Sequence, residues 1–232
     1  LAVVWWQQRL ANLGGEPLVS LRLFGYRQYT MGSLVAVIYG TALFGSTYLL
    51  PVYMQLGLGL SASHVGTILL PAGLVLAVTI AGVGRLADRL PTYLLVSVGL
   101  ALLASSFALT ALMTLSTALW VLTGLCILGR IGLGCILPSL NMGAMRGLPR
   151  ELIAQGSSTI NFLRMLGGAA GVSLCGIILE WRLAVHGDSL GNPQTSGARL
   201  AAFDEVFLLL GAVCALAILA AWRLRGDTLS ST

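Results

Sequence analysis

Two arginines, Arg130 and Arg164, lie inside long apolar runs of a chain in which only 9% of the residues are charged. Arg130 stands in the segment ILGRIGLG, about 20 Å into its run at the rise of an α-helix. A guanidinium at membrane depth is unfavourable by about 2.5 to 3.5 kcal/mol on insertion scales, so it must face a wet cavity or a partner. Arg130 is therefore either a cation facing a pore near substrate or a structural arginine bonded to carbonyls or a neighbouring helix.

Arg164 continues a polar stripe, because Asn161 and Ser157 precede it by three and seven residues. These spacings place all three side chains on roughly one face of a helix. A helix surrounded by lipid would not carry such a stripe, so we expect it to face the bundle or a vestibule. The alternative is that Arg164 snorkels to the membrane interface.

Small residues follow this stripe. Gly167 and Gly171 are four residues apart, and Cys175 lies one turn further on, which favours close helix packing over a ligand site.

An earlier run places Phe44, Tyr48 and Gln55 on one face, with Pro51 freeing a backbone carbonyl nearby. An aromatic and amide surface of this kind suits an amphiphilic drug, and an interfacial aromatic belt is the alternative.

Residues for enzyme chemistry do not gather at membrane depth. Intramembrane catalysis needs a nucleophile with a base, or metal ligands, yet His64 and His186 fall in polar connectors and no acid lies deep in a run. The cysteines lie inside apolar runs without metal-ligand spacing, so we expect them to pack in the core; they are Cys126, Cys135, Cys175 and Cys214. We therefore predict no enzyme, no metal and no cofactor.

The elements that carry these residues are predicted to be membrane helices. Residues of the AVILMFWYC set make up 57% of the chain and its mean hydropathy is +0.91, beyond the range of soluble domains. The runs are apolar on all faces, whereas membrane strands would alternate. Six of them can span a bilayer as helices, approximately at residues 30–54, 62–84, 93–113, 117–140, 157–182 and 203–224.

The arginines predict the orientation of these spans. All 13 basic residues are Arg, and by the positive-inside rule the end that carries more of them is cytoplasmic. The excess charge is thus a topology signal and not a nucleic-acid patch. The cytoplasmic set is Arg9, Arg22, Arg27, Arg85, Arg89, Arg146, Arg150, Arg223 and Arg225, against Arg182 and Arg199 outside. The C-terminus is then cytoplasmic.

The opening residues LAVVWW look like the inner end of a helix that begins upstream, so we expect a fragment of a longer protein. The predicted divisions are a helix end at 1–6, a cytoplasmic connector at 7–29, a six-helix transport bundle at 30–225 and a cytoplasmic tail at 226–232.

The turn GRLADRLPT resembles the signature of the cytoplasmic turns between helices two and three of each half of major facilitator superfamily transporters. The matching residues are Gly84, Leu86, Ala87, Asp88 and Arg89. Pro91, Thr92 and Tyr93 replace the glycine and the two basic residues of that pattern, as in the copy of the C-terminal half.

Other segments come in the order seen in the fourteen-helix drug:proton antiporters of the EmrB/QacA type, namely EPLVSLRLFGYRQYT, YLLPVYMQ, ILLPAGL, GRIGLGCILPSLN and AQGSSTINFLRMLGGAAGVS.

This resemblance implies the C-terminal bundle of such a transporter, built as two inverted three-helix repeats in the inner membrane of a bacterium. It implies proton-coupled efflux of amphiphilic compounds by alternating access, with the proton-titrating acids in a missing N-terminal half. Gly84, Leu86, Asp88 and Arg89 would form a cytoplasmic gating motif, and a periplasmic adaptor protein is a further partner. The alternatives are an exporter of another substrate and a non-transporting sensor or assembly subunit.

Overall fold

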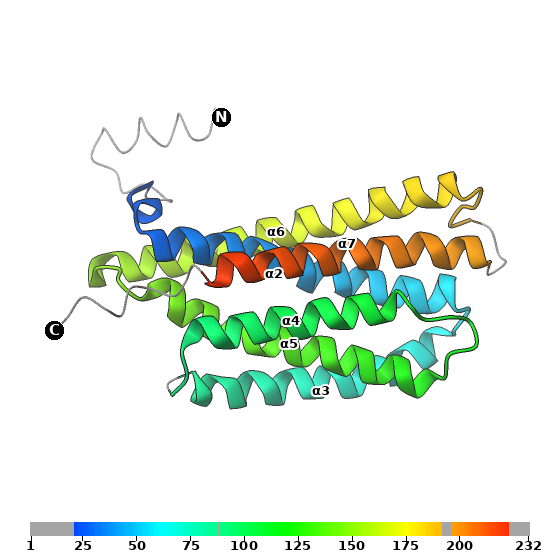
Figure 1. Cartoon of the computed structure of the whole chain (residues 1–232), viewed down its shortest axis with the longest axis horizontal. Helices are drawn as coiled ribbons and strands as arrows, with labels where there is room; N and C mark the ends of the chain where they lie inside the picture. The colour runs from blue at the N-terminus through cyan, green and yellow to red at the C-terminus, as the bar shows by residue number, and fades with distance from the viewer. Residues whose placement is uncertain (1–20, 88, 192–195, 223–232) are drawn as a thin grey trace.

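The computed structural model describes residues 21–87, 89–191 and 196–222, and the described segments are helices joined by short connectors (Figure 1). A short 3-10 turn, η1 (Leu21–Gly25), precedes six helices that are long and apolar enough to cross a membrane. These are α2 (Arg27–Val52), which continues into the π-helical turn η2 (Tyr53–Gly57), then α3 (Ala62–Leu86), α4 (Thr92–Thr110), α5 (Leu119–Met145), α6 (Arg150–Val185) and α7 (Gly197–Trp222). The predicted all-helical membrane bundle with six spans is confirmed.

Successive helices run in opposite directions along the long axis of the bundle (Figure 1). The helix contacts follow a two-fold pattern when α2, α3 and α4 are matched to α5, α6 and α7. The contact of α2 with α6 then corresponds to that of α5 with α3, and the contact of α4 with α5 to that of α7 with α2. The contacts of α2 with α5 and of α4 with α7 correspond to themselves, whereas the smaller contact of α6 with α7 has no counterpart of similar extent between α3 and α4. This is the arrangement expected of two inverted three-helix repeats.

Glycines bring α2 and α6 into backbone contact. A Cβ at Gly40 would overlap the carbonyl oxygen of Arg164, and a Cβ at Gly167 would overlap the backbone of Val37. The Thr41 hydroxyl donates a hydrogen bond of 2.9 Å to the carbonyl oxygen of Gly167 across the same seam. Small residues permit this approach in a membrane, where van der Waals packing and hydrogen bonds hold helices together.

Aromatic side chains fill the part of the core between η2, α4 and α7. The Tyr53 ring meets Phe203 edge-on at 5.5 Å between centroids and Phe207 at 5.3 Å. Phe107 of α4 stacks on Phe207 at 6.3 Å. This cluster joins the end of α2 to α4 and α7, and edge-to-face pairs of this kind stabilise a core beyond their buried area.

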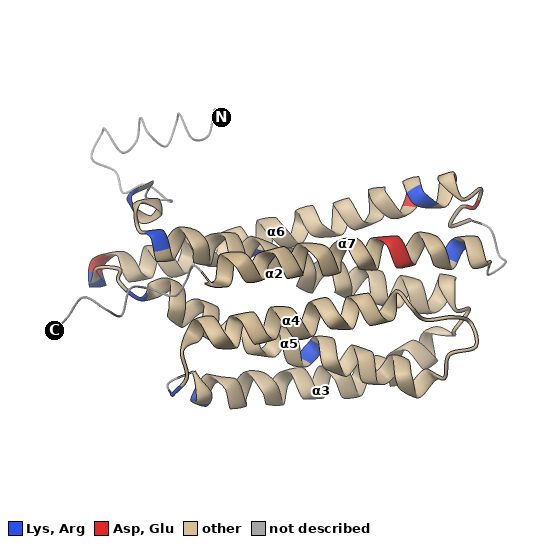
Figure 2. Cartoon of the chain, in the orientation of Figure 1, with Lys and Arg blue, Asp and Glu red and all other residues tan. Residues whose placement is uncertain are grey.

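Charged residues gather at the two ends of the bundle (Figure 2). One end carries the start of α2 with Arg27, the end of α3 with Arg85 and the start of α6 with Arg150. The other end carries Arg182 in the last turn of α6 and Arg199 in the first turns of α7. Apart from Arg130 and Arg164, which lie within α5 and α6, the described arginines are thus divided between the ends as the sequence predicted.

Two helices begin earlier than the apolar runs predicted. α6 starts at Arg150 and not near residue 157, because Pro149 adopts the extended N-cap conformation and Glu151 in the first turn favours the positive end of the helix dipole. α7 starts at Gly197 and not near 203, so Arg199 is a helical residue and not part of an exposed connector. Polar first turns extend a helix beyond its apolar segment, which hydropathy alone does not detect.

The predicted helix end at 1–6 and tail at 226–232 lie outside the described residues, as does most of the connector at 7–29.

Candidate functional site

Polar side chains of three helices lie within electrostatic range of one another. Tyr39 of α2 is buried, and its phenol is within range of both Arg130 of α5 and Arg164 of α6. Arg130 lies near the middle of its 27-residue helix, and Arg164 lies near the middle of its 36-residue helix. Both positively charged groups therefore sit at membrane depth, where an arginine requires a cavity or a partner.

The glycine seam fixes the position of Arg164. Gly40 follows Tyr39 directly, and it is the residue whose missing side chain lets the Arg164 carbonyl approach α2. The Nε atom of Arg164 is buried and has no hydrogen-bond partner among the described residues. A buried donor without an acceptor costs about 1 to 3 kcal/mol, and more when it is charged, so an acceptor at Nε would be stabilising.

Arg130 is fixed by a second glycine seam, between α5 and α4. A Cβ at Gly132 would lie 2.7 Å from the Gly99 carbonyl oxygen, and one at Gly129 would lie 2.8 Å from the Ser106 hydroxyl. Arg130 lines a recess of about 10 Å³ that is bordered by residues of α2, α4 and α5, which is room for about one water molecule. That Arg130 is kept from lipid stays a prediction.

Neither arginine has an acidic partner in the described part of the chain. The ion pairs there are Arg182 with Glu205, His186 with Glu205, and Arg199 with Asp188. The described acids lie toward the ends of the bundle, whereas a basic turn is visible on α5 near its centre (Figure 2). The arrangement is therefore a positively charged site that is chemically suited to an oxyanion or a strong dipole.

The remaining predicted cavity residues lie on different surfaces. Asn161 and Ser157 are exposed on α6, and Gln55 is exposed in η2. Phe44 and Tyr48 are half-buried against α6, since a Cβ at Gly168 would overlap the Phe44 ring and one at Gly176 would lie 3.7 Å from the Tyr48 hydroxyl. The structure thus brings Phe44 and Tyr48 to the α2–α6 seam, while Gln55 stands apart at the end of α2.

Gly167 and Gly171 both lie in the seam itself. A Cβ at Gly171 would be 2.6 Å from the Cα of Thr41, so either residue with a side chain would separate the helices.

The turn with the signature residues anchors α3 and α4 to α5. Gly84 and Leu86 belong to the last turn of α3, Arg89 is exposed, and Asp88 lies outside the described residues. Beside them, a small apolar cluster of Val83, Ala87, Leu95 and Cys135 joins the three helices, with Ile131 and Met142 packed against it. Ile131 is the neighbour of Arg130, so the turn and the arginine site share α5.

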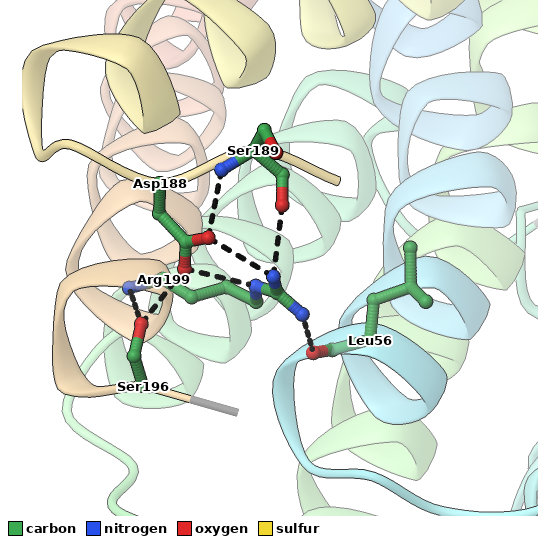
Figure 3. A network of polar contacts seen from close by, with 5 residues as sticks. All are labelled: Leu56, Asp188, Ser189, Ser196 and Arg199. Carbon is green, nitrogen blue, oxygen red and sulfur yellow. Dashed lines mark hydrogen bonds and ion pairs between the residues drawn. The ribbon is translucent and has the colours of Figure 1, made fainter. Parts of the chain in front are cut away.

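Sequence reasoning missed the most buried charged residue, Arg199, which was expected in an exposed outer loop. Its side chain is 2% exposed and donates to Asp188 through Nε at 3.2 Å and Nη2 at 3.1 Å (Figure 3). It also donates to the carbonyl oxygens of Ser189 at 2.8 Å and Leu56 at 3.1 Å. This network ties the α6–α7 connector to the end of α2. The signal in the sequence that could have predicted this network was the presence of an Asp and an Arg in the same connector.

Two further residues at this end have contacts that the sequence did not predict. His186 lies in the connector as expected, but it is half-buried as the C-cap of α6 and contacts Glu205 at 3.3 Å. Asp204 lies within α7, and its Oδ1 atom is buried without a hydrogen-bond partner in the described segments. His64 is exposed in the first turn of α3 as expected near a connector, and the four cysteines are buried.

Among residues 21–87, 89–191 and 196–222, no group of His, Cys, Asp or Glu side chains is arranged to hold a metal ion.

Comparison with known proteins gives a consistent result. The family model described as Major Facilitator Superfamily matches residues 6–172. The multidrug resistance protein B homolog of Mycobacterium tuberculosis is 32% identical over 201 residues, which cover 82% of this chain and 36% of that protein.

Two other relatives are similar at lower identity. The lincomycin resistance protein LmrB of Listeria monocytogenes is 26% identical over 213 residues, covering 88% of this chain and 45% of that protein. The multidrug transporter protein MdtP of Bacillus subtilis is 26% identical over 167 residues, covering 72% of this chain and 31% of that protein. The chain therefore spans less than half the length of these relatives.

Proposed function

The chain belongs to the major facilitator superfamily, and on that premise we propose that it forms the C-terminal half of a secondary transporter that exports amphiphilic compounds in exchange for protons. The family consists of transport proteins, so the hypothesis of an intramembrane enzyme is set aside. The relatives named for multidrug or lincomycin resistance support an export function.

The observation that carries this proposal is the pair of unpaired guanidiniums at membrane depth. Arg130 and Arg164 are held by glycine seams beside the buried Tyr39, and no acid of the described residues pairs with them. A protein that only spans the bilayer gains nothing from such groups. A transporter uses them on the wall of a midplane cavity, which lies between its two halves.

In this mechanism residues 30–225 act as one half that rocks against the other half. Arg130, Arg164 and Asn161 contribute polar contacts on the cavity side, and Phe44, Tyr48 and Gln55 contribute aromatic and amide surface. The turn with Gly84, Leu86, Asp88 and Arg89 controls the approach of the halves on the cytoplasmic side, since it is anchored to α5. Gly167 and Gly171 let α6 slide on α2 as the cavity opens.

The proposed location is the bacterial inner membrane, with the arginine-rich end and the C-terminus in the cytoplasm. The proposed partners are the lipid bilayer, an amphiphilic substrate, the proton, the N-terminal half and a periplasmic adaptor protein.

Reconstitution of the complete transporter tests this function. In liposomes with an imposed pH gradient, a panel of anionic, neutral and cationic amphiphiles should include compounds that are transported against their gradient and that accelerate the collapse of the pH gradient. The chain 1–232 alone should do neither, because it lacks the opposing wall of the cavity. Substrate-driven proton movement by this chain alone, or its absence from the complete protein for every compound tried, would contradict the proposal.

A further inference from the structure

Arg199 shows how this protein holds a structural arginine. Its guanidinium is surrounded by the Asp188 carboxylate and by the carbonyl oxygens of Ser189 and Leu56 (Figure 3). Each of these contacts is a charge-assisted hydrogen bond of ordinary length. A structural arginine in this fold is therefore recognised by its bonds to carbonyls and a carboxylate.

Arg130 and Arg164 have no such environment. The hydrogen bonds and ion pairs of the described residues include none from either guanidinium, and Arg164 Nε is both buried and without an acceptor. The ionisable groups near Arg130 are the Cys126 thiol and the Tyr39 phenol, neither of which is a carboxylate. The alternative of a structural arginine bonded to carbonyls thus has no support at these two positions.

The two arginines lie against the same helix, α2. The Arg164 backbone packs against Gly40, the neighbour of Tyr39, and Arg130 shares a recess with Ser46 of α2. Both guanidiniums are within electrostatic range of the Tyr39 phenol. The cluster therefore offers two positive groups and a phenol hydroxyl around an unfilled acceptor position in a medium where charge is poorly screened. Such a cluster attracts an oxyanion and repels a cation.

We propose that Arg130 and Arg164 bind the acidic group of the substrate, so that the transporter takes amphiphilic anions such as carboxylates. This inference rests on the proposed export function and names the substrate class of the same site. The anion enters the neutralising position beside Tyr39 and accepts hydrogen bonds from the two guanidiniums, while its apolar body remains among the helix side chains. Binding of one carboxylate lowers the charge of the site from two positive groups to one, which favours its burial at the midplane.

A matched set of probes tests the charge preference. Pyrenebutyrate, pyrenebutanol and pyrenebutylamine share one aromatic body, and at about pH 7 they are an anion, a neutral compound and a cation. Binding to the complete transporter in detergent is measured by pyrene fluorescence, and export is measured in proteoliposomes. Wild type should bind pyrenebutyrate at least about tenfold more tightly than pyrenebutylamine, as expected for a charge-assisted contact.

Substitutions assign this preference to the two residues. Arg130→Gln and Arg164→Gln should each weaken pyrenebutyrate binding by about tenfold and leave pyrenebutanol unchanged, because they remove one charge while keeping hydrogen-bond donors. Arg130→Lys should retain most of the preference for the anion. Arg146→Gln at the end of α5 and Arg150→Gln at the start of α6 are matched controls, since both arginines are exposed, and they should retain the wild-type affinities.

Each outcome decides the inference. If a carboxylate of the other half already neutralises the site, wild type shows no preference for pyrenebutyrate, and the inference is wrong. It is also wrong if the glutamine variants weaken all three probes equally, which would mark a structural role. Export of pyrenebutanol or pyrenebutylamine but not of pyrenebutyrate would reject the substrate class and leave the export function standing, whereas export of none would count against both.

Discussion

The Asp188–Arg199 pair concentrates opposite charges at one buried point of the α6–α7 connector. The side chains are 4% and 2% exposed, and the Ser196 hydroxyl donates to the same carboxylate at 2.8 Å. The Arg199 guanidinium and these hydrogen bonds hold the pKa of the Asp188 carboxyl below its ordinary value of about 3.9. A carboxyl with a lowered pKa contributes stability above its ordinary pKa and loses it as the pH falls through the lower value.

We predict that Asp188→Asn lowers the melting temperature of the detergent-solubilised transporter at about pH 7, because the buried guanidinium loses its counter-charge. The contribution of this pair should be constant between about pH 5 and 8 and should fade below about pH 4. The difference in melting temperature between wild type and variant should therefore become smaller only in acid. Glu151→Gln, at an exposed acid of the other end, is the control and should melt as wild type does. A gap that changes across the neutral range would contradict this assignment.

For single residues, the sequence predicted how deep a side chain lies in the membrane better than it predicted which residues that side chain contacts. Arg130 and Arg164 were recognised from the length of apolar chain on each side, which is a local property. The burial of Arg199 depends on Leu56, which is 143 residues away, and on the connector folding back over the end of α2. No local pattern reports a contact of that kind. The pairing of His186 with Glu205 was missed for the same reason, since it joins two helices across a connector.

The α2–α6 seam is the feature that places the site at the level of elements. Gly40, Gly167 and Gly171 leave room for backbone of the opposite helix, so the neighbours of these glycines are rigid atoms and not flexible side chains. Overpacking a site of this kind costs about 1 to 3 kcal/mol or more, because the helices must separate.

Gly40→Val is expected to destabilise the complete transporter by at least about 1 to 3 kcal/mol and to abolish substrate binding, since it displaces Arg164 from Tyr39. Gly73→Val is the matched control, because Gly73 lies in the membrane-spanning helix α3 with nothing within 4 Å of its added Cβ. Stability is measured by denaturant titration in mixed micelles and binding by pyrene fluorescence. Equal losses in both variants would show that the seam is not the cause.

The apolar runs predicted all six helices, because a bilayer demands about 20 apolar residues per span. The starts of α6 and α7 were wrong by several residues. In both cases the first turns are polar. The helix starts are set by Pro149 and by the Ser196 hydroxyl, which accepts a hydrogen bond from the Arg199 N–H, and not by hydropathy. The small residues of the seam were predicted as packing positions. Their contacts on α2 could not be predicted, because the spacing of residues on one helix does not identify the residues that face it on another.

At the scale of the whole molecule, the distribution of arginines between the two ends of the bundle predicts its orientation in the membrane. Cysteine labelling in intact cells tests this orientation. Ser116→Cys and Ser189→Cys, both exposed at the end with few arginines, should react with a membrane-impermeant maleimide. Leu90→Cys, exposed in the α3–α4 turn, should react only after permeabilisation. The four native cysteines are buried and provide the unlabelled background. Labelling of Leu90→Cys alone in intact cells would reverse the orientation.

The matched contacts of the two helix triplets carry a consequence for the history of the chain. A unit that crosses a bilayer three times ends on the side opposite to its start, so a second copy joined to it must enter upside down. The contacts of α2 with α5 and of α4 with α7 then correspond to the self-complementary interface of a symmetric dimer, in which each patch meets its own counterpart. Sequence changes at these two contacts are constrained on both sides at once, because each helix packs against the counterpart of itself. An ancestral protein of three helices, which inserted in both directions and formed a dimer, would have packed through the same pairs of helices.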